Sequence, residues 1–415
     1  MTKPTAHPGR TRMHPSPAIL CVAYKYFDSD PRIIREVNAL LDRGYLVDMI
    51  CPRPPRGEYA CPPGLRFHCI TMDRRRGSRA RYLLEYLHFF AFAVLASAAL
   101  YLRRRHPVVQ VFVMPEILML AGVLPKLLGA RLLMDWEDPS REMYLTKYGV
   151  RSSRSLAIRL IELVERFAVG LADEVITPNE GFRSTFVARG YSRDKIAIVP
   201  NAPDRRVFRE REGGAAPTGT GEFLLLFHGT LVERCGIHLA IHALPSVRAE
   251  IPNARLHVVG DGEADYLERC RKLVTMLGLE DAVTFAGRLP ITRIPELIHR
   301  ASVGVIPNLR TAFEIAFPQK ALEFSLLRVP LAMSRLTGHQ EYFAEDEAFY
   351  FEPGDAGELA RRIVEVHHDP EEARRRAERS LRRCRALEWE SSYLAAVERL
   401  VGSRARPARQ VVAPS

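Results

Sequence analysis

The chain has 415 residues, which is too long for a single hydrophobic core and predicts two domains. An apolar fraction of 47% excludes a chain that is disordered throughout, and a net charge of +11 favours anionic partners such as phosphates, nucleic acid or an acidic membrane face. The chain has seven cysteines, an odd number, and none of them forms a C-x-x-C pair. This pattern indicates a reducing compartment.

The first half of the chain alternates between predicted strands and helices. Residues 1–16 are polar, Pro-rich and unlike a signal peptide, so we expect a disordered lead-in. Residues 18–24 and 45–51 read as buried strands joined by a helix over 32–43, which is a β-α-β unit. The pattern predicts a mostly parallel sheet over residues 17–203, with helices on both faces. Its further strands are expected at 108–114, 131–136, 174–177 and 196–199, and its further helices at 117–128, 155–171 and 181–189.

The segment 83–102 is apolar apart from Glu85, His88 and Ser97, and arginines lie on both sides of it. A membrane-spanning helix needs about 20 nearly uninterrupted apolar residues, whereas the clean run here is only 89–102. Three interpretations stay open, namely a helix of the domain, an interfacial helix that dips into lipid, and a true span. The flanking arginines suit anionic headgroups.

A linker is predicted over residues 204–221, which are rich in charge, Gly and Pro, and the alternation then restarts. We expect a second α/β domain over 222–385 and a last helix over 386–403, followed by a disordered tail at 404–415. The strands of this domain are expected at 223–227, 255–259, 283–286, 303–307 and 330–333, and its helices at 236–251, 266–277, 294–301 and 320–327.

The most informative stretch is Phe313–Phe324, which joins a short apolar strand to a helix. The first turn of a helix offers free N–H groups that suit phosphate, and Lys320 adds a positive charge beside them. Glu323 is an acceptor suited to a pair of sugar hydroxyls. These groups together are what a nucleotide diphosphate sugar requires.

Other strand ends in the second half carry candidate phosphate ligands. Gly229 allows close approach of the backbone to a ligand, and Arg234 can donate two hydrogen bonds to phosphate oxygens, although an ordinary turn stays open. Gly262 follows another strand and could be a simple turn, and Arg288 could form a structural salt bridge. The sequence has no G-x-x-x-x-G-K-[ST] motif and no third partner for His238 and His242, which disfavours a P-loop and a metal site.

Acidic residues follow two strands of the first half. Asp28 and Asp30 come after the first strand, and Glu137 and Asp138 come after the strand at 131–136. Such clusters can bind metal or act as a base, and capping of the next helix is the alternative.

The chain resembles the retaining glycosyltransferases of family 4, of the bacterial polysaccharide-biosynthesis type. The resemblance covers about residues 18–402 and depends on the order and spacing of seven stretches, each weak alone. These stretches are 30–36, 172–178, 198–201, 227–230, 258–263, 285–288 and 318–324.

The resemblance implies an α/β fold called GT-B, in which two Rossmann-like doubly wound domains face each other across a cleft, with the last helix crossing back to the first domain. It implies a metal-independent enzyme without a cofactor. The donor-binding residues would be Gly229, Thr230, Arg234, Gly262, Arg288, Lys320 and Glu323, with Glu323 on the ribose. The catalytic residues would be Glu314, Glu137 and Asp30. The family's first glutamate would fall on Ile315, so Glu314 is displaced by one position.

We therefore expect transfer of a sugar from a nucleotide-diphosphate donor to a glycan or lipid-linked acceptor, in cell-surface polysaccharide (exopolysaccharide) biosynthesis. The expected location is cytoplasmic and peripheral on an anionic membrane surface, at the inner face of the plasma membrane, with no nucleic-acid partner. Two alternatives stay open, a nucleotide-sugar epimerase of similar fold and a non-enzymatic basic binding protein.

Overall fold

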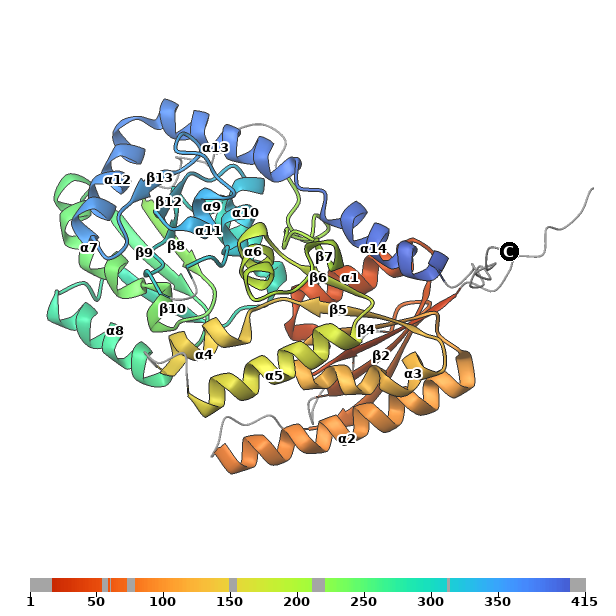
Figure 1. Ribbon diagram of the computed structural model, residues 1–415. Coiled ribbons are helices and arrows are strands. Elements are labelled where there is room, and N and C mark those ends of the chain that lie inside the picture. The colour runs from red at the N-terminus through yellow and green to blue at the C-terminus, as the bar shows by residue number, and fades with distance from the viewer. Residues whose placement is uncertain are drawn as a thin grey trace, which may run out of the picture. The chain divides into compact units, whose positions relative to one another are not determined.

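The structure is a computed structural model that describes residues 17–53, 59, 61–72, 79–148, 155–210, 221–311 and 314–403 (Figure 1). The predicted lead-in at 1–16, the predicted tail at 404–415 and most of the predicted linker lie outside these residues. The described residues form two compact units. The first unit contains the residues up to Trp136, Val164–Ile176 and those from Tyr393 onward, and the second contains the residues of Glu137–Leu163 and Thr177–Ser392.

The first sheet has seven strands in the order β3-β2-β1-β4-β5-β6-β7, and the pairings from β3 through β6 are parallel. Its central strands are apolar runs that are buried along nearly their whole length, as expected of a parallel sheet with helices on both faces. The strands are β1 (Ala18–Ala23), β2 (Leu46–Arg53), β3 (Leu65–Thr71), β4 (Val108–Val113), β5 (Arg131–Trp136), β6 (Glu174–Thr177) and β7 (Ile196–Ile198).

The helices that accompany this sheet begin with α1, where Asp30 caps the N-terminus and Pro31 occupies the first turn. They are α1 (Pro31–Asp42), α2 (Arg79–Arg104), α3 (Val123–Leu127), α4 (Ser140–Tyr148), α5 (Leu156–Leu171) and α6 (Glu180–Ala188), with short 3₁₀ helices η1 (Phe27–Ser29), η2 (Glu116–Gly122) and η3 (Arg193–Lys195). Within the described part of the chain, α2 is the one helix long and apolar enough, over Leu84–Arg104, to cross a membrane.

The second sheet has six parallel strands in the order β10-β9-β8-β11-β12-β13. The order reverses between β8 and β11, and ligands of open α/β sheets bind outside the strand carboxyl ends at such a reversal. The strands are β8 (Phe223–His228), β9 (Ala254–Val259), β10 (Val283–Gly287), β11 (Val303–Ile306), β12 (Leu331–Ser334) and β13 (Phe349–Phe351).

Helices α7 to α13 of the second half bury apolar residues such as Ile241 and Phe324 against this sheet. They are α7 (Ile237–Glu250), α8 (Ala264–Met276), α9 (Ile294–Arg300), α10 (Gln319–Leu326), α11 (Thr337–Gln340), α12 (Ala356–His368) and α13 (Pro370–Arg385), with η4 (Glu233–Cys235) and η5 (Ile291–Arg293). The last helix is α14 (Trp389–Ser403), and its residues from Tyr393 onward belong to the first unit. In α14 the hydroxyl of Tyr393 donates to Gln110 of β4, 2.5 Å away.

The structure confirms the expected alternation of strands and helices in both halves. It adds elements that were not predicted, among them strands β3 and β13 and helices α4 and α11. The helix predicted over 117–128 is instead the 3₁₀ helix η2 followed by the five-residue α3, because Gly122 and Pro125 interrupt the segment.

Candidate functional site

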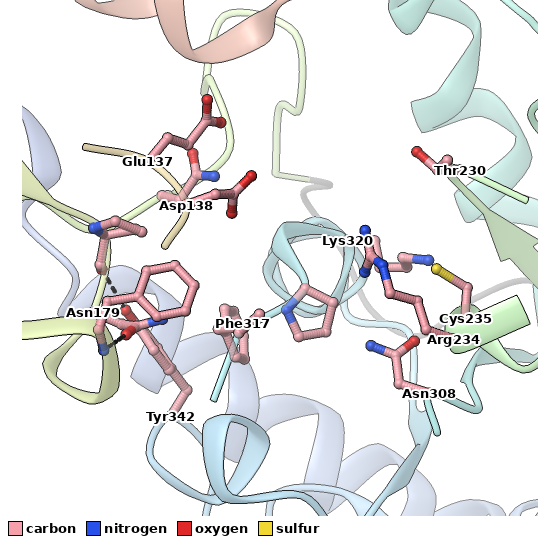
Figure 2. Close-up of a pocket in the computed structure, with 15 residues that line it drawn as sticks. Glu137, Asp138, Asn179, Thr230, Arg234, Cys235, Asn308, Phe317, Lys320 and Tyr342 are labelled. Atoms are coloured by element: carbon pink, nitrogen blue, oxygen red, sulfur yellow. Dashed lines mark hydrogen bonds between the residues drawn. The ribbon is translucent and has the colours of Figure 1, made fainter. Parts of the chain in front are cut away.

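A pocket of about 190 Å³ lies within the second unit, at the β8/β11 reversal (Figure 2). The loop after β8 supplies Thr230, Arg234 and Cys235, and the residue that follows β11 and Pro307 is Asn308. The beginning of α10 contributes Pro318 and Lys320. The carboxyl ends of two neighbouring strands and the start of a helix therefore form one wall.

This wall is positively charged. Lys320 Nζ lies 4.0 Å from the centroid of the Phe227 ring, and no ion pair joins this lysine to any residue that the structure describes. Burial and the charge of Arg234 lower the pKa of Lys320, whereas Cys235 and Glu323 oppose that shift. The N-cap residue of α10 is Pro318, which makes no side-chain cap hydrogen bond, and the Ala321 amide donates to its carbonyl, so the N–H groups ahead of Ala321 suit an anion.

Glu323 lies one turn after Lys320, on the same helix, and is 7% exposed. Its Oε2 is 3.4 Å from Nε2 of His228, the last residue of β8. Burial raises the pKa of Glu323 to about 7, against the opposing charge of Lys320. Burial and the same lysine lower the pKa of His228 to about 3, so the imidazole is neutral.

The opposite side of the pocket carries two carboxylates. Figure 2 shows Glu137 and Asp138, which follow β5, across the pocket from Lys320 and Arg234. The pocket thus offers positive charge on one side and hydrogen-bond acceptors on the other.

An aromatic pair also lines the pocket. The rings of Phe317 and Tyr342 stack with centroids 4.0 Å apart, and the Tyr342 hydroxyl donates to the carbonyl of Pro178. Asn179 lies beside them, where its Oδ1 accepts from the Phe182 amide and caps α6. Tyr342 is therefore held both by its hydrogen bond and by stacking on Phe317.

Two asparagines in the pocket have buried acceptors without a partner. The Oδ1 atoms of Asn201 and Asn308 accept no hydrogen bond from the described residues. A buried acceptor without a partner is costly, so a hydroxyl-bearing ligand would satisfy both.

Two glycines fix the loops of this site. Gly236 has φ +68°, and a Cβ there would lie 1.8 Å from the carbonyl oxygen of Pro307. Gly260 has φ +140°, and a Cβ there would lie 1.9 Å from the carbonyl oxygen of Gly229. The backbones of the loops therefore pack directly on each other, which no other residue type allows.

The structure brings together four of the ten candidate residues, since Glu137, Thr230, Arg234 and Lys320 all line the pocket. Gly229 is adjacent, because a Cβ on it would lie 3.1 Å from Lys320 Nζ. Glu323 lies beside Lys320, as described above.

The other four candidates do not line the pocket. Gly262 forms a bridge with Leu231, and Arg288 is exposed after β10. Glu314 Oε2 lies 3.7 Å from Arg310 Nη1. Asp30 accepts from two amides of α1, which it caps, and pairs with Lys25 at 2.6 Å. Its catalytic role stays a prediction.

Sequence reasoning missed Asn308, Phe317 and Tyr342. Asn308 lies just beyond a strand end, as Arg234 does, and this placement could have identified it. No group of three metal-ligating side chains occurs among the described residues.

Two family models match the chain in succession. Residues 31–202 match the glycosyl transferase 4-like domain, and residues 209–383 match glycosyl transferases group 1. The second match contains the loops after β8 and β11 and the start of α10.

Among curated proteins, the glycogen synthase of Mycobacterium tuberculosis is 29% identical over 240 residues, which cover 56% of this chain and 55% of that protein. The chain thus spans about half the length of the curated relatives it matches.

Solved structures cover nearly the whole fold. Sucrose-phosphate synthase from Thermosynechococcus elongatus has a TM-score of 0.72 at 21% identity, covering 94% of this chain and 99% of that one. The Anabaena protein HepE, in complex with UDP and glucose, has a TM-score of 0.66 at 16% identity, covering 93% and 99%. The two parallel sheets and both family matches show that the chain belongs to the family-4-type glycosyltransferases of GT-B fold, enzymes that transfer sugars.

Proposed function

We propose that the protein transfers a sugar, with retention of anomeric configuration, from a nucleotide-diphosphate donor to a glycan or lipid-linked acceptor in cell-surface polysaccharide biosynthesis. The observation that carries this proposal is the pocket, in which cationic side chains and a helix N-terminus lie opposite two carboxylates. The location that we propose is the cytoplasmic, inner face of the plasma membrane, because a chain with a net charge of +11 is attracted to anionic lipid there.

The donor diphosphate would lie against Arg234, Lys320 and the first amides of α10. Arginine forms paired hydrogen bonds with phosphate oxygens, and a desolvated lysine adds a strong point charge. HepE, which shares the fold, binds UDP and glucose. Glu323, next to Lys320, would accept hydrogen bonds from the ribose hydroxyls.

The sugar would occupy the rest of the pocket. Its hydroxyls would donate to the Oδ1 atoms of Asn201 and Asn308 and to the carboxylates of Glu137 and Asp138. Phe317 and Tyr342 would supply an apolar surface for the ring.

Transfer requires that the bond from the anomeric carbon to the diphosphate breaks and that the acceptor oxygen bonds to this carbon. The diphosphate leaves with the electron pair, and Lys320, Arg234 and the α10 amides stabilise its negative charge. In this proposal these groups take the role that a metal ion would otherwise have. Glu137 is the group in the pocket that would take the acceptor's proton.

The test combines donor binding with transfer. A panel of nucleotide sugars is screened by thermal shift, because a true donor raises the melting temperature by mass action. The donor found is then used in a transfer assay with Lys320→Ala, which should lower kcat/KM by about a hundredfold because it removes a buried charge from the leaving group.

Lys272→Ala is the matched control, since this lysine is exposed on α8 and pairs with the exposed Glu268, so its activity should equal that of the wild type. Full activity of Lys320→Ala would overturn the proposal. So would salt-sensitive binding of RNA by a chain that no nucleotide sugar stabilises, or conversion of a free donor without any acceptor.

A further inference from the structure

Helix α2 presents large aliphatic side chains to solvent along one face, with the exposed His88 among them. Leu84, Leu87, Leu95 and Leu102 are 67%, 50%, 71% and 55% exposed. Their spacings of three, eight and seven residues keep these side chains on one side of an α-helix, and we call this side the leucine face. Monomeric proteins rarely expose several large aliphatic side chains in one stripe, so such a face indicates a contact surface.

The opposite face of α2 is packed in the core of the first unit. Phe89, Ala93 and Tyr101 have no exposed surface, and the Phe89 ring lies 5.0 Å from the ring of Tyr24 next to β1. Near the end of the helix Arg104 donates to Asp48 of β2, 3.1 Å away. The helix is therefore packed on the first unit from Phe89 to Arg104, which favours a helix that lies on this unit.

Helix α3 adds exposed leucines in the same unit. The Tyr101 hydroxyl of α2 donates to the carbonyl of Leu128, which joins the end of α3 to α2. Leu124, Leu127 and Leu128 are 39%, 77% and 41% exposed. Figure 1 shows α3 beside the C-terminal part of α2.

Both ends of α2 are cationic. The helix sequence carries Arg79 and Arg81 near its start and Arg103 in its last turn, with Arg105 directly after it. Both Arg103 and Arg105 are exposed. Between Leu84 and Leu102 the one acidic residue is Glu85, which is half-buried.

We propose that the leucine face is a lipid-contact surface, on which α2 lies parallel to a bilayer that contains anionic lipid. Its leucines would enter the boundary between headgroups and acyl chains, while Arg103 and Arg105 contact the headgroup phosphates. A second copy of the chain fits less well, because a parallel pair of α2 helices would bring these arginines of the two copies together.

This inference rests on the proposed function only for its choice of partner, since a lipid-linked acceptor is met at a membrane. The residues that would contact lipid follow from the exposure of the side chains in the structure and could not be predicted from the sequence. Phe89 lies in the apolar run but is buried, so lipid would meet Leu87 and Leu95 instead.

The experiment is co-sedimentation of the full chain with phosphatidylcholine vesicles, with and without phosphatidylglycerol, in the absence of any nucleotide sugar. Wild-type chain should bind the anionic vesicles and be released by salt. Leu87→Gln/Leu95→Gln should lower the vesicle partition coefficient by about tenfold or more. Its melting temperature should stay unchanged, because both side chains are exposed.

Met276→Gln is the matched control, since this methionine is 81% exposed on α8 of the second unit, and it should bind like the wild type. Absence of wild-type binding, or equal binding by the double variant, would overturn the inference. A wild-type dimer that the double variant converts to monomers would overturn it in favour of a second copy.

A thermal shift with the donor, run on the same samples, separates the two proposals. A chain that responds to the donor but ignores vesicles refutes only the lipid surface. A chain that binds vesicles through the leucine face but responds to no nucleotide sugar refutes only the proposed transfer.

Discussion

Both units carry charged side chains around the carboxyl ends of their central strands, but they use them differently. In the first unit, Arg32 donates from Nε and Nη2 to the two carboxylate oxygens of Asp135, at 3.0 and 2.7 Å, and lies 3.1 Å from Glu36. In the second unit, Lys320 lies against a ring and beside a pocket.

The difference lies in what pairs the buried charges. In the first unit buried charges bond each other, although Glu36 Oε1 accepts no hydrogen bond from the described residues, whereas Lys320 in the second unit has no ion pair with a described residue. Glu36 extends the first network, because it accepts from Gln110, which in turn accepts from Tyr393 of α14. The charges of the first unit therefore bind one another, whereas Lys320 of the second unit lines a pocket.

The largest expected effect comes from breaking the network of the first unit. Arg32→Met should lower the free energy of unfolding by about 3–5 kcal/mol, because it leaves Asp135 buried without its partner. Urea denaturation monitored by circular dichroism measures this loss. Arg43→Met, which breaks the exposed ion pair with Glu398, should cost less than about 1 kcal/mol. Equal losses for the two variants would contradict the comparison.

The second prediction concerns the free energy that the burial of the Glu323 carboxylate costs the folded protein. Its pKa is raised to about 7 by burial, so in the folded state it keeps its proton while an unfolded carboxyl loses it near 4.5. Stability should therefore fall as pH rises from 4.5 to 7, by up to about 3 kcal/mol from this group. Glu323→Gln removes the effect and should be more stable than the wild type at pH 8 but not at pH 4.

Melting temperatures of both proteins between pH 4 and pH 8 test this, with the exposed Glu268→Gln as the control that should follow the wild type. The same Glu323→Gln variant should show a smaller thermal shift with the donor, because an amide replaces an acceptor for the ribose. A stability difference that does not change with pH would refute the assignment.

The smallest effect is expected at Asp30. Asparagine caps helices about as well as aspartate, so Asp30→Asn should change stability by less than about 1 kcal/mol and activity by less than about threefold. Asp30→Ala, which removes the cap, should cost about 1 kcal/mol. A loss of activity of a hundredfold in the Asn variant, with stability retained, would instead make Asp30 catalytic.

Much of the fold follows from local patterns in the sequence. Continuous apolar runs such as Val108–Val113 predict buried parallel strands, and Gly44 marks the end of α1. β3 escaped prediction because Leu65–Thr71 mixes polar and apolar residues and is only partly buried. Edge strands bury less, so their pattern is weaker.

The candidate site was predicted where strand ends and helix starts coincide, as for Lys320 and Arg234. The partner of a buried charge cannot be predicted from local patterns in the sequence, because partners such as Arg32 and Asp135 are 103 residues apart. The orientation of α2 was equally hidden, since an apolar helix with leucines and aromatics on both sides gives no sign of which side is buried.

The packing of backbone on backbone at Gly236 and Gly260 has a consequence for protein engineering. A library aimed at a new donor preference can randomise Thr230, Asn201 and Asn308, whose side chains face the pocket. It should leave the two glycines constant, because any larger residue there would push apart the main chain on which those side chains are mounted.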